Sequence, residues 1–446
     1  MEKYANLFDI KKRIRFQTQV VSISKDDLKN EQIPWIVQTE IVTDGKKETY
    51  EFDFVVIATG LFSQPNIPTF KGQHRFSGII TNPQEIKSIE QLENKDVLVI
   101  GCGKCATDMT VLASKYARSC HMLFRRAHWM LPRQIVSGFL PVRILFIRAL
   151  STIYPPIPNA PCGFLLRFLH EKFPSLFMKI SEGIGNDIMS IHGPEFSEDK
   201  IFIPQHPLRN IENVAMISSD FVQLKRQHRF TSKLATIDEI LDGKTVRLNT
   251  GEELQADIII AATGFSQQFP FFSEKDLQSM GLREADGSIQ LNLYRRVVPV
   301  GIPNIAFAGH VASTAYWTIA EITSHWISDY FLKRLKLPKT KDEMYREIQE
   351  NGEFIVKIFN RNVENYRYYW INLIEIYLND IGVDLHRTTN WISEYFGIYR
   401  PERIKGLHEE RKIIFLTGKK PTHFYLSFKL TIFIVFFLFF IYLFFF

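Results

Sequence analysis

Two stretches of the chain repeat one pattern of polar and hydrophobic positions. TDGKKETYEFDFVVIATG (43–60) places a polar turn before two short strand-like runs, and NTGEELQADIIIAATGF (249–265) repeats that order. Such a turn between β-rich runs predicts two connected strands, and the unbroken runs FVVIA and IIIAA predict strands buried on both faces. Each run ends in Ala-Thr-Gly, where a glycine lets the backbone pass close to a ligand. The residues are Ala58, Thr59, Gly60, Ala262, Thr263 and Gly264.

The segment between these repeats has the pattern of a strand, a helix and a second strand. DVLVIG (96–101) is rich in β-branched residues and predicts the first strand. The next residues predict a helix over 104–116, and SCHMLFR (119–125) predicts the second strand. The expected apolar face of the helix consists of Met109, Leu112, Ala113 and Tyr116.

The turn GCGKCA (101–106) between the first strand and the helix fits two different chemistries. As a C-x-x-C motif, Cys102 and Cys105 would form a thioredoxin-type redox pair. As a G-x-G-x-x-A motif, the turn would bind a dinucleotide pyrophosphate. The redox reading leaves both Ala-Thr-Gly segments unexplained, and no second ligand pair is spaced for zinc, so we favour the dinucleotide. Its candidate binding residues are Gly101, Gly103, Lys104, Cys105 and Ala106.

Two arginines at the expected end of the second strand indicate which dinucleotide would bind. Arg125 and Arg126 follow that strand, and no acidic residue lies between Ser119 and Arg126. An acidic residue at this place binds the ribose 2′-hydroxyl of NAD, whereas an arginine accommodates the 2′-phosphate of NADP. The sequence therefore predicts NADP.

Composition narrows the choice of partners. Of 446 residues, 46% are hydrophobic and 23% charged, with a net charge of +6, which is ordinary for a globular protein of two or three domains. There is no stripe of basic residues with interleaved aromatics, so we expect no nucleic-acid partner. The four cysteines are too few for a disulfide framework.

The C-terminal run LTIFIVFFLFFIYLFFF (430–446) carries no charge. As a helix it would be about 25 Å long, slightly less than a hydrocarbon core of roughly 30 Å, and Lys429 could snorkel. Lys419 and Lys420 precede it, which predicts a membrane anchor with the body in the cytoplasm. The endoplasmic reticulum is one membrane compatible with this. The alternatives are a membrane-surface segment or a misread gene end.

Two further regions are expected to be helical. The Pro-, Phe- and Leu-rich insertion 138–207 predicts helices that cover a cleft as a substrate lid. Because Arg143, Arg148 and Arg167 are interspersed among its apolar residues, a second membrane-contacting surface is the alternative. The region 341–425 is amphipathic and predicts a helical extension.

Four phrases in one order resemble the flavin-containing monooxygenases: ATGLFSQPNIPTFKG, LENKDVLVIGCGKCATDM, RRAHWMLPR and ADIIIAATGF. The likeness covers about residues 4–335. It implies an FAD domain interrupted by an NADPH domain, with the two Ala-Thr-Gly segments as the crossings between them. It also implies that NADPH reduces the flavin, that O₂ reacts with it, and that a soft nitrogen or sulfur nucleophile is oxygenated.

The resemblance extends to single residues. The glycine loop matches the family's NADP loop, Asp108 an acidic position in its helix, and Arg125 its 2′-phosphate clamp. NIAFAGH (304–310) resembles the late FAD-domain strand with Gly309, and the helix expected over 313–335 would point its N-terminus at the flavin. His310 could approach the flavin ring, but we favour a capping or packing role. Trp129 and Arg133 match positions near the cofactor cleft, although a core role for the tryptophan is the alternative. No catalytic residue is assigned.

The sequence also departs from the family pattern. The family begins with a strand and a G-x-G-x-x-G loop for the FAD pyrophosphate, and no such loop precedes Gly101. The G-x-G at Gly183 lies in a helical context and is rejected. In the family motif F-x-G-x-x-x-H, Phe76 and Gly78 are present but Asn82 stands for the histidine. We therefore expect an N-terminally truncated FAD domain that binds FAD weakly.

These patterns predict an α/β fold with two Rossmann-like dinucleotide-binding domains, C-terminal helices and a transmembrane helix. The expected boundaries are 1–93 and 261–340 for the FAD domain, 94–260 for the NADP domain, 341–425 for the extension and 426–446 for the anchor. The expected function is an FAD- and NADPH-dependent monooxygenase acting with O₂ on a small molecule, with no metal. The alternatives are a catalytically impaired NADP-binding module and a Baeyer–Villiger or amine-hydroxylating relative.

Overall fold

The computed structural model describes most of the chain. The described residues are 2–135, 137–161, 164–193, 196, 200–206, 208, 214–283, 289–313, 315–338, 340–359, 370–388 and 390–418. The apolar run 430–446, expected to be an anchor, lies outside them. Within the described ranges, no helix combines the length and apolar character that crossing a bilayer requires.

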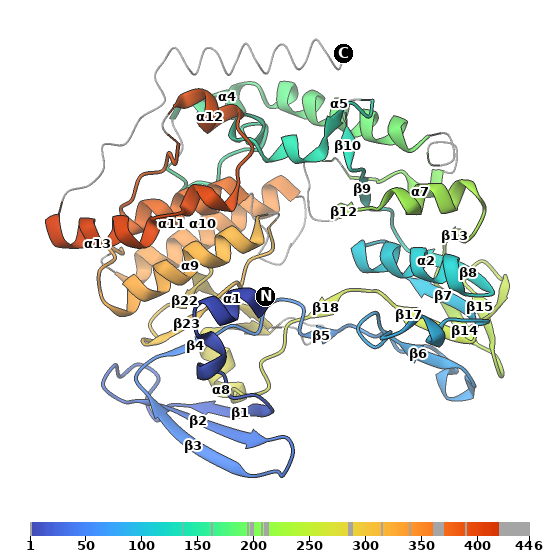
Figure 1. Cartoon of the computed structure of the whole chain (residues 1–446), viewed down its shortest axis with the longest axis horizontal. Coiled ribbons are helices and arrows are strands. Elements are labelled where there is room, and N and C mark those ends of the chain that lie inside the picture. Colours follow the sequence, from blue (N-terminus) through green and yellow to red (C-terminus); the bar gives the residue numbers. More distant parts are fainter. Residues whose placement is uncertain are drawn as a thin grey trace.

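A five-stranded parallel sheet forms the centre of one lobe, on the right of Figure 1. Its strands pair in the order β13-β8-β7-β17-β6, and β7 and β8 flank the helix α2, as the βαβ pattern predicts. The bounds are β6 (Ile79–Thr81), β7 (Asp96–Ile100), α2 (Lys104–Tyr116), β8 (Ser119–Phe124), β13 (Thr231–Leu234) and β17 (Ile258–Ala261).

Successive side chains of β7 point to opposite faces of this sheet, and each face packs against a different layer. Val97 and Val99 belong to the apolar cluster that includes residues of α2 and of α7 (Ser219–Arg226), whereas Leu98 belongs to the cluster on the other face. That other face is covered by an antiparallel sheet, β14 (Ile237–Ile240), β15 (Thr245–Leu248) and β16 (Glu253–Gln255). Burial on both sides explains why 258–261 reads as an unbroken apolar run.

The second lobe differs from the predicted second Rossmann-like sheet. Its antiparallel sheet is β1 (Thr18–Ser24), β2 (Trp35–Ile41) and β3 (Lys47–Phe52), and its parallel part consists of β4 (Val55–Ile57) and β23 (Ile305–Phe307). In the described chain β4 pairs only with β23, and Val56 is 45% exposed. The expectation that 54–58 is buried on both faces is therefore wrong, because Val56 lies on an uncovered face of β4 whereas its neighbour Ile57 is buried.

The two Ala-Thr-Gly segments connect the lobes. Directly after them, β5 (Gln64–Pro65) pairs antiparallel with β18 (Phe265–Ser266). The Asn66 amide donates to the Gly264 carbonyl at 3.0 Å, and the Thr263 hydroxyl donates to the Asn66 carbonyl. Figure 1 shows this short pair between the lobes. The two crossings are thus tied to each other.

The described part of the insertion is mostly helical, as expected, and contains one short strand, β11. α5 packs on the first lobe, where the ring of Trp129 on β9 lies against Gly185. Gly183 lies within α5, which confirms that its G-x-G is no phosphate loop. The elements are β9 (Trp129–Leu131), β10 (Gln134–Ile135), β11 (Leu140–Pro141), η4 (Val142–Phe146), α3 (Arg148–Ser151), α4 (Phe164–Lys172), α5 (Pro174–His192), η5 (Lys200–Phe202) and β12 (Val214–Met216).

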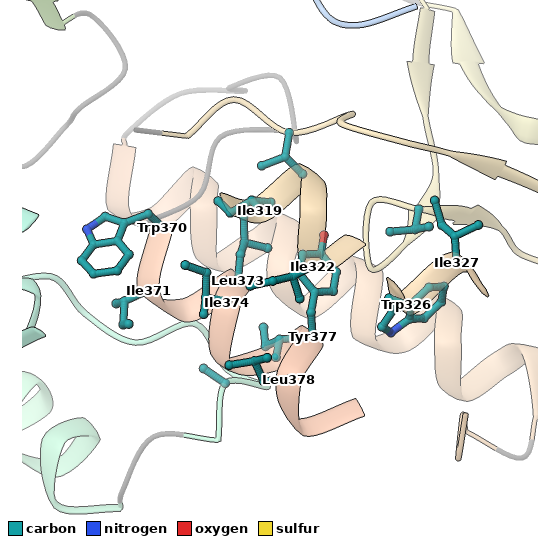
Figure 2. Packing of buried hydrophobic residues seen from close by; sticks show 14 of the residues in the cluster. Ile319, Ile322, Trp326, Ile327, Trp370, Ile371, Leu373, Ile374, Tyr377 and Leu378 are labelled. Atoms are coloured by element: carbon teal, nitrogen blue, oxygen red, sulfur yellow. The ribbon is translucent and has the colours of Figure 1, made fainter. Parts of the chain in front are cut away.

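Helices of the C-terminal region pack on the second lobe. The helix expected over 313–335 is α9, with bounds Tyr316–Phe331, and its residues Ile322 and Trp326 meet Ile374 and Tyr377 of α11 in a buried cluster (Figure 2). The other helices here are α10 (Lys341–Phe359), α11 (Trp370–Ile381), α12 (Trp391–Phe396), η7 (Pro401–Ile404) and α13 (Leu407–Thr417). The remaining elements are α1 (Glu2–Leu7), η1 (Ile10–Arg13), η2 (Gln73–Arg75), η3 (Ile89–Gln91), α8 (Glu274–Met280), β19 (Gly281–Arg283), β20 (Ile289–Leu291), β21 (Leu293–Tyr294) and β22 (Val298–Pro299).

Candidate functional site

The glycine loop lies against the second crossing. Gly101 follows β7 with φ +131°, and a Cβ there would fall inside contact distance of the Ala262 carbonyl oxygen and 3.3 Å from Cβ of Ala106. The Ala262 amide donates to the Ile100 carbonyl at 2.8 Å. Only glycine combines this φ with such a close approach. Gly101 therefore allows the loop and the crossing to lie in contact.

Gly103 has a different environment. It precedes α2 with an extended backbone (φ −83°, ψ −176°), and no side chain caps the helix. The one neighbour that a Cβ at this position would meet within 4 Å is Nδ1 of His128, at 3.9 Å. No side chain caps the first-turn N–H groups of Lys104, Cys105 and Ala106, and such a helix N-terminus favours an anion.

The bounds of α2 are those predicted, but its buried face is not. Tyr116 is 41% exposed, and Met109 and Leu112 pack only partly buried. Small residues allow a helix to lie close to a sheet, and the larger side chains then lie at the flanks of the contact. The hydrophobic pattern alone did not indicate this arrangement. The buried residues are Ala106, Thr107, Thr110, Ala113 and Ser114.

The two arginines reach the same edge of the sheet as the glycine loop. Ile100 of β7 is in register with Leu123 of β8, so Arg125 and Arg126 follow β8 at the carboxyl edge where Gly101 follows β7. Both arginines are exposed, and neither forms an ion pair among the described residues. Lys104 pairs with Asp108 one turn along α2, which places the acidic position of the helix beside the loop.

The cysteines do not have the properties of a redox pair. Cys102 is 4% exposed, and burial raises the pKa of its thiol to about 12, so it stays protonated at neutral pH. Although Cys105 is exposed at the surface, partial burial of its thiol and the charge of Asp108 raise its pKa as well. Both cysteines are free thiols. A reactive dithiol needs a lowered thiol pKa, so the burial of Cys102 argues against the redox alternative. No metal-ligating cluster occurs among the residues that the structure describes.

A second candidate edge lies where β4 and β23 end. These parallel strands lead into Ala58, Thr59 and Gly60 and into Gly309. Gly60 (φ +72°) and Gly264 (φ +99°) border open space, whereas a Cβ at Gly309 (φ +69°) would lie 2.6 Å from the Tyr316 hydroxyl. The carboxyl ends of parallel strands form the ligand-binding edge of open α/β sheets.

Two buried polar groups were not foreseen from the sequence. Nε2 of Gln267, in the segment after β18, and Oγ of Ser313, in the segment after β23, are buried without a hydrogen-bond partner in the described chain. Buried polar atoms normally have a partner. These two residues thus fit a group that offers hydrogen bonds, although no sequence motif indicated them.

A sequence profile described as flavin-binding monooxygenase-like matches residues 1–174 and 208–389. The chain belongs to this family. Human flavin-containing monooxygenase 5 is 30% identical over 82% of this chain and 62% of its own length, and flavin-containing monooxygenase 1 of Sus scrofa is 28% identical over 69% and 53%. The chain thus spans about 60% or less of the length of these relatives. Family membership supports the FAD and NADP(H) predicted from the sequence.

Solved structures of such enzymes share the fold. Cyclohexanone monooxygenase from Rhodococcus sp. Phi1 bound to NADP⁺ superposes with a TM-score of 0.56 at 18% identity, covering 85% of this chain and 80% of that one. An oxidised steroid monooxygenase bound to NADP gives 0.53 at 18% identity, with 82% and 77% covered. S-allyl-L-cysteine S-oxygenase from Allium sativum gives 0.51 at 15% identity, with 94% and 70% covered.

Other positions that resemble the flavin-containing monooxygenases have packing roles. His310 is 6% exposed between Phe269 and Phe307, and burial and the charge of Arg296 lower its pKa to about 3, so it is neutral. This agrees with the packing role favoured above. Trp129 is a core residue whose Nε1 donates to the His206 carbonyl at 2.8 Å.

Asn82, which stands where the family motif has a histidine, has a structural role. Asn82 is buried, and its Oδ1 accepts from the Gln84 amide at 2.9 Å, which closes the turn after β6. At Gly78 a Cβ would lie 2.5 Å from the Asp257 carbonyl oxygen, so this glycine allows close contact with the segment before β17. This part of the motif thus holds the edge strand of the parallel sheet.

Proposed function

We propose that the protein is a flavin-dependent monooxygenase that uses NADPH and O₂ to oxygenate a soft nitrogen or sulfur of a small molecule. The observation that carries this is the contact between the glycine loop and the second crossing, at Gly101 and Ala262. That contact brings the proposed NADP site next to the connection leading to the β4–β23 edge. When bound, the flavin supplies the oxygen chemistry.

The residues of this chain would bind and orient the two cofactors. The N–H groups at the start of α2 would hold the NADP pyrophosphate, and Gly103 leaves room for it. Arg125 and Arg126 would hold the 2′-phosphate by charge-assisted hydrogen bonds. At the β4–β23 edge, Gly60 and Gly309 would let the backbone approach FAD, and Gln267 and Ser313 would offer polar contacts. The lid role of 138–207 stays a prediction.

Replacing Arg125 tests the NADP site. We expect Arg125→Ala to weaken NADP⁺ binding about tenfold to hundredfold, because a charge-assisted hydrogen bond contributes roughly 1.5–3 kcal/mol, and to leave NAD⁺ binding unchanged. Calorimetric titration of both nucleotides measures this, with the exposed Arg13→Ala as the matched control. Equal affinity of the unmodified protein for NADP⁺ and NAD⁺ would contradict the proposal.

The FAD site is less complete in this sequence. Residues 96–106 are the one strand-and-glycine-loop pattern in the chain, so these 446 residues on their own should bind FAD weakly. An absorption spectrum of the purified protein measures the bound flavin. Stoichiometric FAD would show that Gly60, Gly309 and their neighbours suffice.

An NADP-binding module without oxygenase activity is the second candidate function. It is favoured by the contrast between the complete βαβ unit around Gly101 and the two-stranded β4–β23 pair, whose Val56 is exposed. Adding excess FAD with NADPH and an amine or sulfide separates the two candidates. NADPH oxidation coupled to product supports the enzyme, whereas NADP⁺ binding without oxidation supports the module.

A further inference from the structure

A buried cluster of ion pairs joins the insertion to the C-terminal helices. Arg148, on α3 of the insertion, is 5% exposed. Its Nε and Nη2 lie 3.0 and 2.9 Å from Oε1 of Glu394 on α12, its Nη1 pairs with Glu375 on α11, and its Nη2 donates to the Leu385 carbonyl at 3.1 Å. One side chain of the insertion thus contacts three segments of the C-terminal region.

The cluster continues away from Arg148. The second oxygen of Glu394 accepts from the amides of Arg387 and Thr388, each at 3.0 Å, and Arg403 lies 3.4 Å from its first oxygen. Arg387 in turn pairs with Glu410 of α13 at 2.6 Å. The cluster thus contains three arginines and three glutamates, and all but Arg148 come from residues 370–418; burial raises the pKa of Glu375 despite the charge of Arg148.

Electrostatics hold Glu394 ionised although it is 1% exposed. Burial alone would raise the pKa of this carboxyl, but the charges of Arg148 and Arg403 outweigh burial and lower the pKa below its ordinary value. Removing Arg148 alone would leave the buried Glu375 without its ionic partner and Glu394 with Arg403 as its remaining one, which is costly in a low-dielectric interior. The cluster therefore favours one arrangement of α3 against α11 and α12.

Apolar and backbone contacts surround this cluster. Tyr395 of α12 belongs to the apolar cluster of the insertion, which includes Trp129 of the first lobe. The Tyr399 amide donates to the Phe146 carbonyl at 3.0 Å, and Ile147 forms a β-bridge with Ile398. The insertion thus packs on both lobes, through Trp129 on the first lobe and through Ile157 and Ala160 in the apolar cluster of α9 and α11.

The attachment lies far from the crossings. α11 packs on α9 of the second lobe in the cluster shown in Figure 2, so the contact at Arg148 connects the first lobe to the second. In Figure 1 the crossing pair β5–β18 lies low between the lobes, whereas α12 and α4 lie at the upper edge. The lobes are therefore connected at the short strand pair and, separately, through the insertion, where the buried ionic cluster lies beside apolar contacts of Ile157 and Ala160.

We propose that the Arg148 cluster is a clasp that fixes the orientation of the two lobes. A pair of two-residue strands is a narrow connection, about which lobes can rotate when nothing else joins them. A second attachment on the other side opposes such rotation, and an ionic fork sets its geometry more specifically than apolar packing does. The clasp is thus the element whose opening would let the lobes turn about the crossings.

Distances between the lobes test this clasp. Spin labels on Thr43→Cys, in the β2–β3 turn, and Thr250→Cys, in the β15–β16 turn, report the lobe separation by pulsed electron resonance, in a Cys105→Ser and Cys162→Ser background. Both labelled positions are exposed. We expect one narrow distance distribution with the clasp intact and a distribution at least twice as broad in Arg148→Met.

Arg411→Met is the matched control. Arg411 is also a buried arginine, paired with Asp329 at 2.6 Å, but this pair joins α13 to α9 within the second lobe. Its loss should lower stability without broadening the distribution. If Arg411→Met broadens the distribution as much as Arg148→Met does, the effect is general destabilisation and the clasp is refuted.

A charge-neutral variant keeps the test decisive if Arg148→Met does not fold. Arg148→Met combined with Glu375→Gln leaves Glu394 paired with Arg403 and Glu410 paired with Arg387, and such replacements of a buried ion pair commonly preserve the fold. A broad distribution in this double variant supports the clasp, and a distribution as narrow as that of the unmodified protein overturns it. A broad distribution in the unmodified protein also overturns it.

Discussion

Gly101 and Gly103 lie two residues apart but have different tasks. Gly101 needs a left-handed φ and contact with Ala262, whereas Gly103 has an ordinary backbone conformation and open space in front of it. Gly101→Ala should therefore lower the free energy of unfolding by at least about 2 kcal/mol. Gly103→Ala should cost less than about 1 kcal/mol but weaken NADP⁺ binding at least tenfold, because its methyl group enters the proposed pyrophosphate space.

Urea unfolding and NADP⁺ titration of the two variants measure these effects. Each variant serves as the control for the other, since both add one methyl group to the same loop. A Gly103→Ala protein that binds NADP⁺ as tightly as the unmodified chain would place the pyrophosphate elsewhere.

His310 is expected to make stability depend on pH. Its pKa in the folded state, about 3, lies below the value of roughly 6.5 for an unfolded histidine. The unfolded chain therefore takes up a proton that the folded chain does not, and stability present above pH 6.5 is lost as the pH falls toward 3. This one group should contribute a slope approaching about 1.4 kcal/mol per pH unit.

Urea unfolding between pH 4 and pH 7 checks this expectation. His310→Gln should flatten the dependence, and the exposed His74→Gln should leave it unchanged. An equally steep dependence in His310→Gln would assign the effect to other groups.

At the scale of elements, the contact between α5 and β9 shows how the insertion packs on the first lobe. A Cβ at Gly185 of α5 would lie 2.8 Å from Cη2 of Trp129, which is buried and cannot turn away. Alanine favours a helix by up to about 1 kcal/mol over glycine, but overpacking typically costs 1–3 kcal/mol. Gly185→Ala should therefore destabilise the protein by about 1 kcal/mol in urea unfolding.

A double-mutant cycle isolates this contact. In a Trp129→Leu background the ring is absent, so Gly185→Ala should become neutral or stabilising. If the alanine costs the same in both backgrounds, Trp129 does not seat the helix.

At the scale of the whole molecule, membrane attachment is the remaining proposal. The apolar run 430–446 lies outside the described residues, and the expectation that it is an anchor rests on its sequence alone. Deleting 430–446 should move the protein from the membrane fraction to the supernatant, whereas a carbonate wash should leave the full chain in the membrane. If carbonate releases the full chain, the protein is attached to the membrane only peripherally.

Local sequence determined the parts of the fold whose contacts are local. The βαβ unit, the bounds of α2 and both strands before Ala-Thr-Gly follow from hydrophobic period and glycine position. The order of the motifs also identified the family. These patterns are informative because the hydrophobic residues must recur with the period of the strand or helix for that element to bury one face. The assignment of the individual binding residues stays a prediction.

Tertiary structure decided what depends on residues distant in the chain. Val56 is exposed and Ile57 is buried, so one face of β4 lies uncovered, although its run resembles that of β17. Arg148 was read as one of several cations that could face a membrane, yet it is buried because Glu375 and Glu394, more than 200 positions away, meet it in space. Charge pairing over such separations leaves no periodic mark in the sequence, so only the folded chain could disclose the cluster.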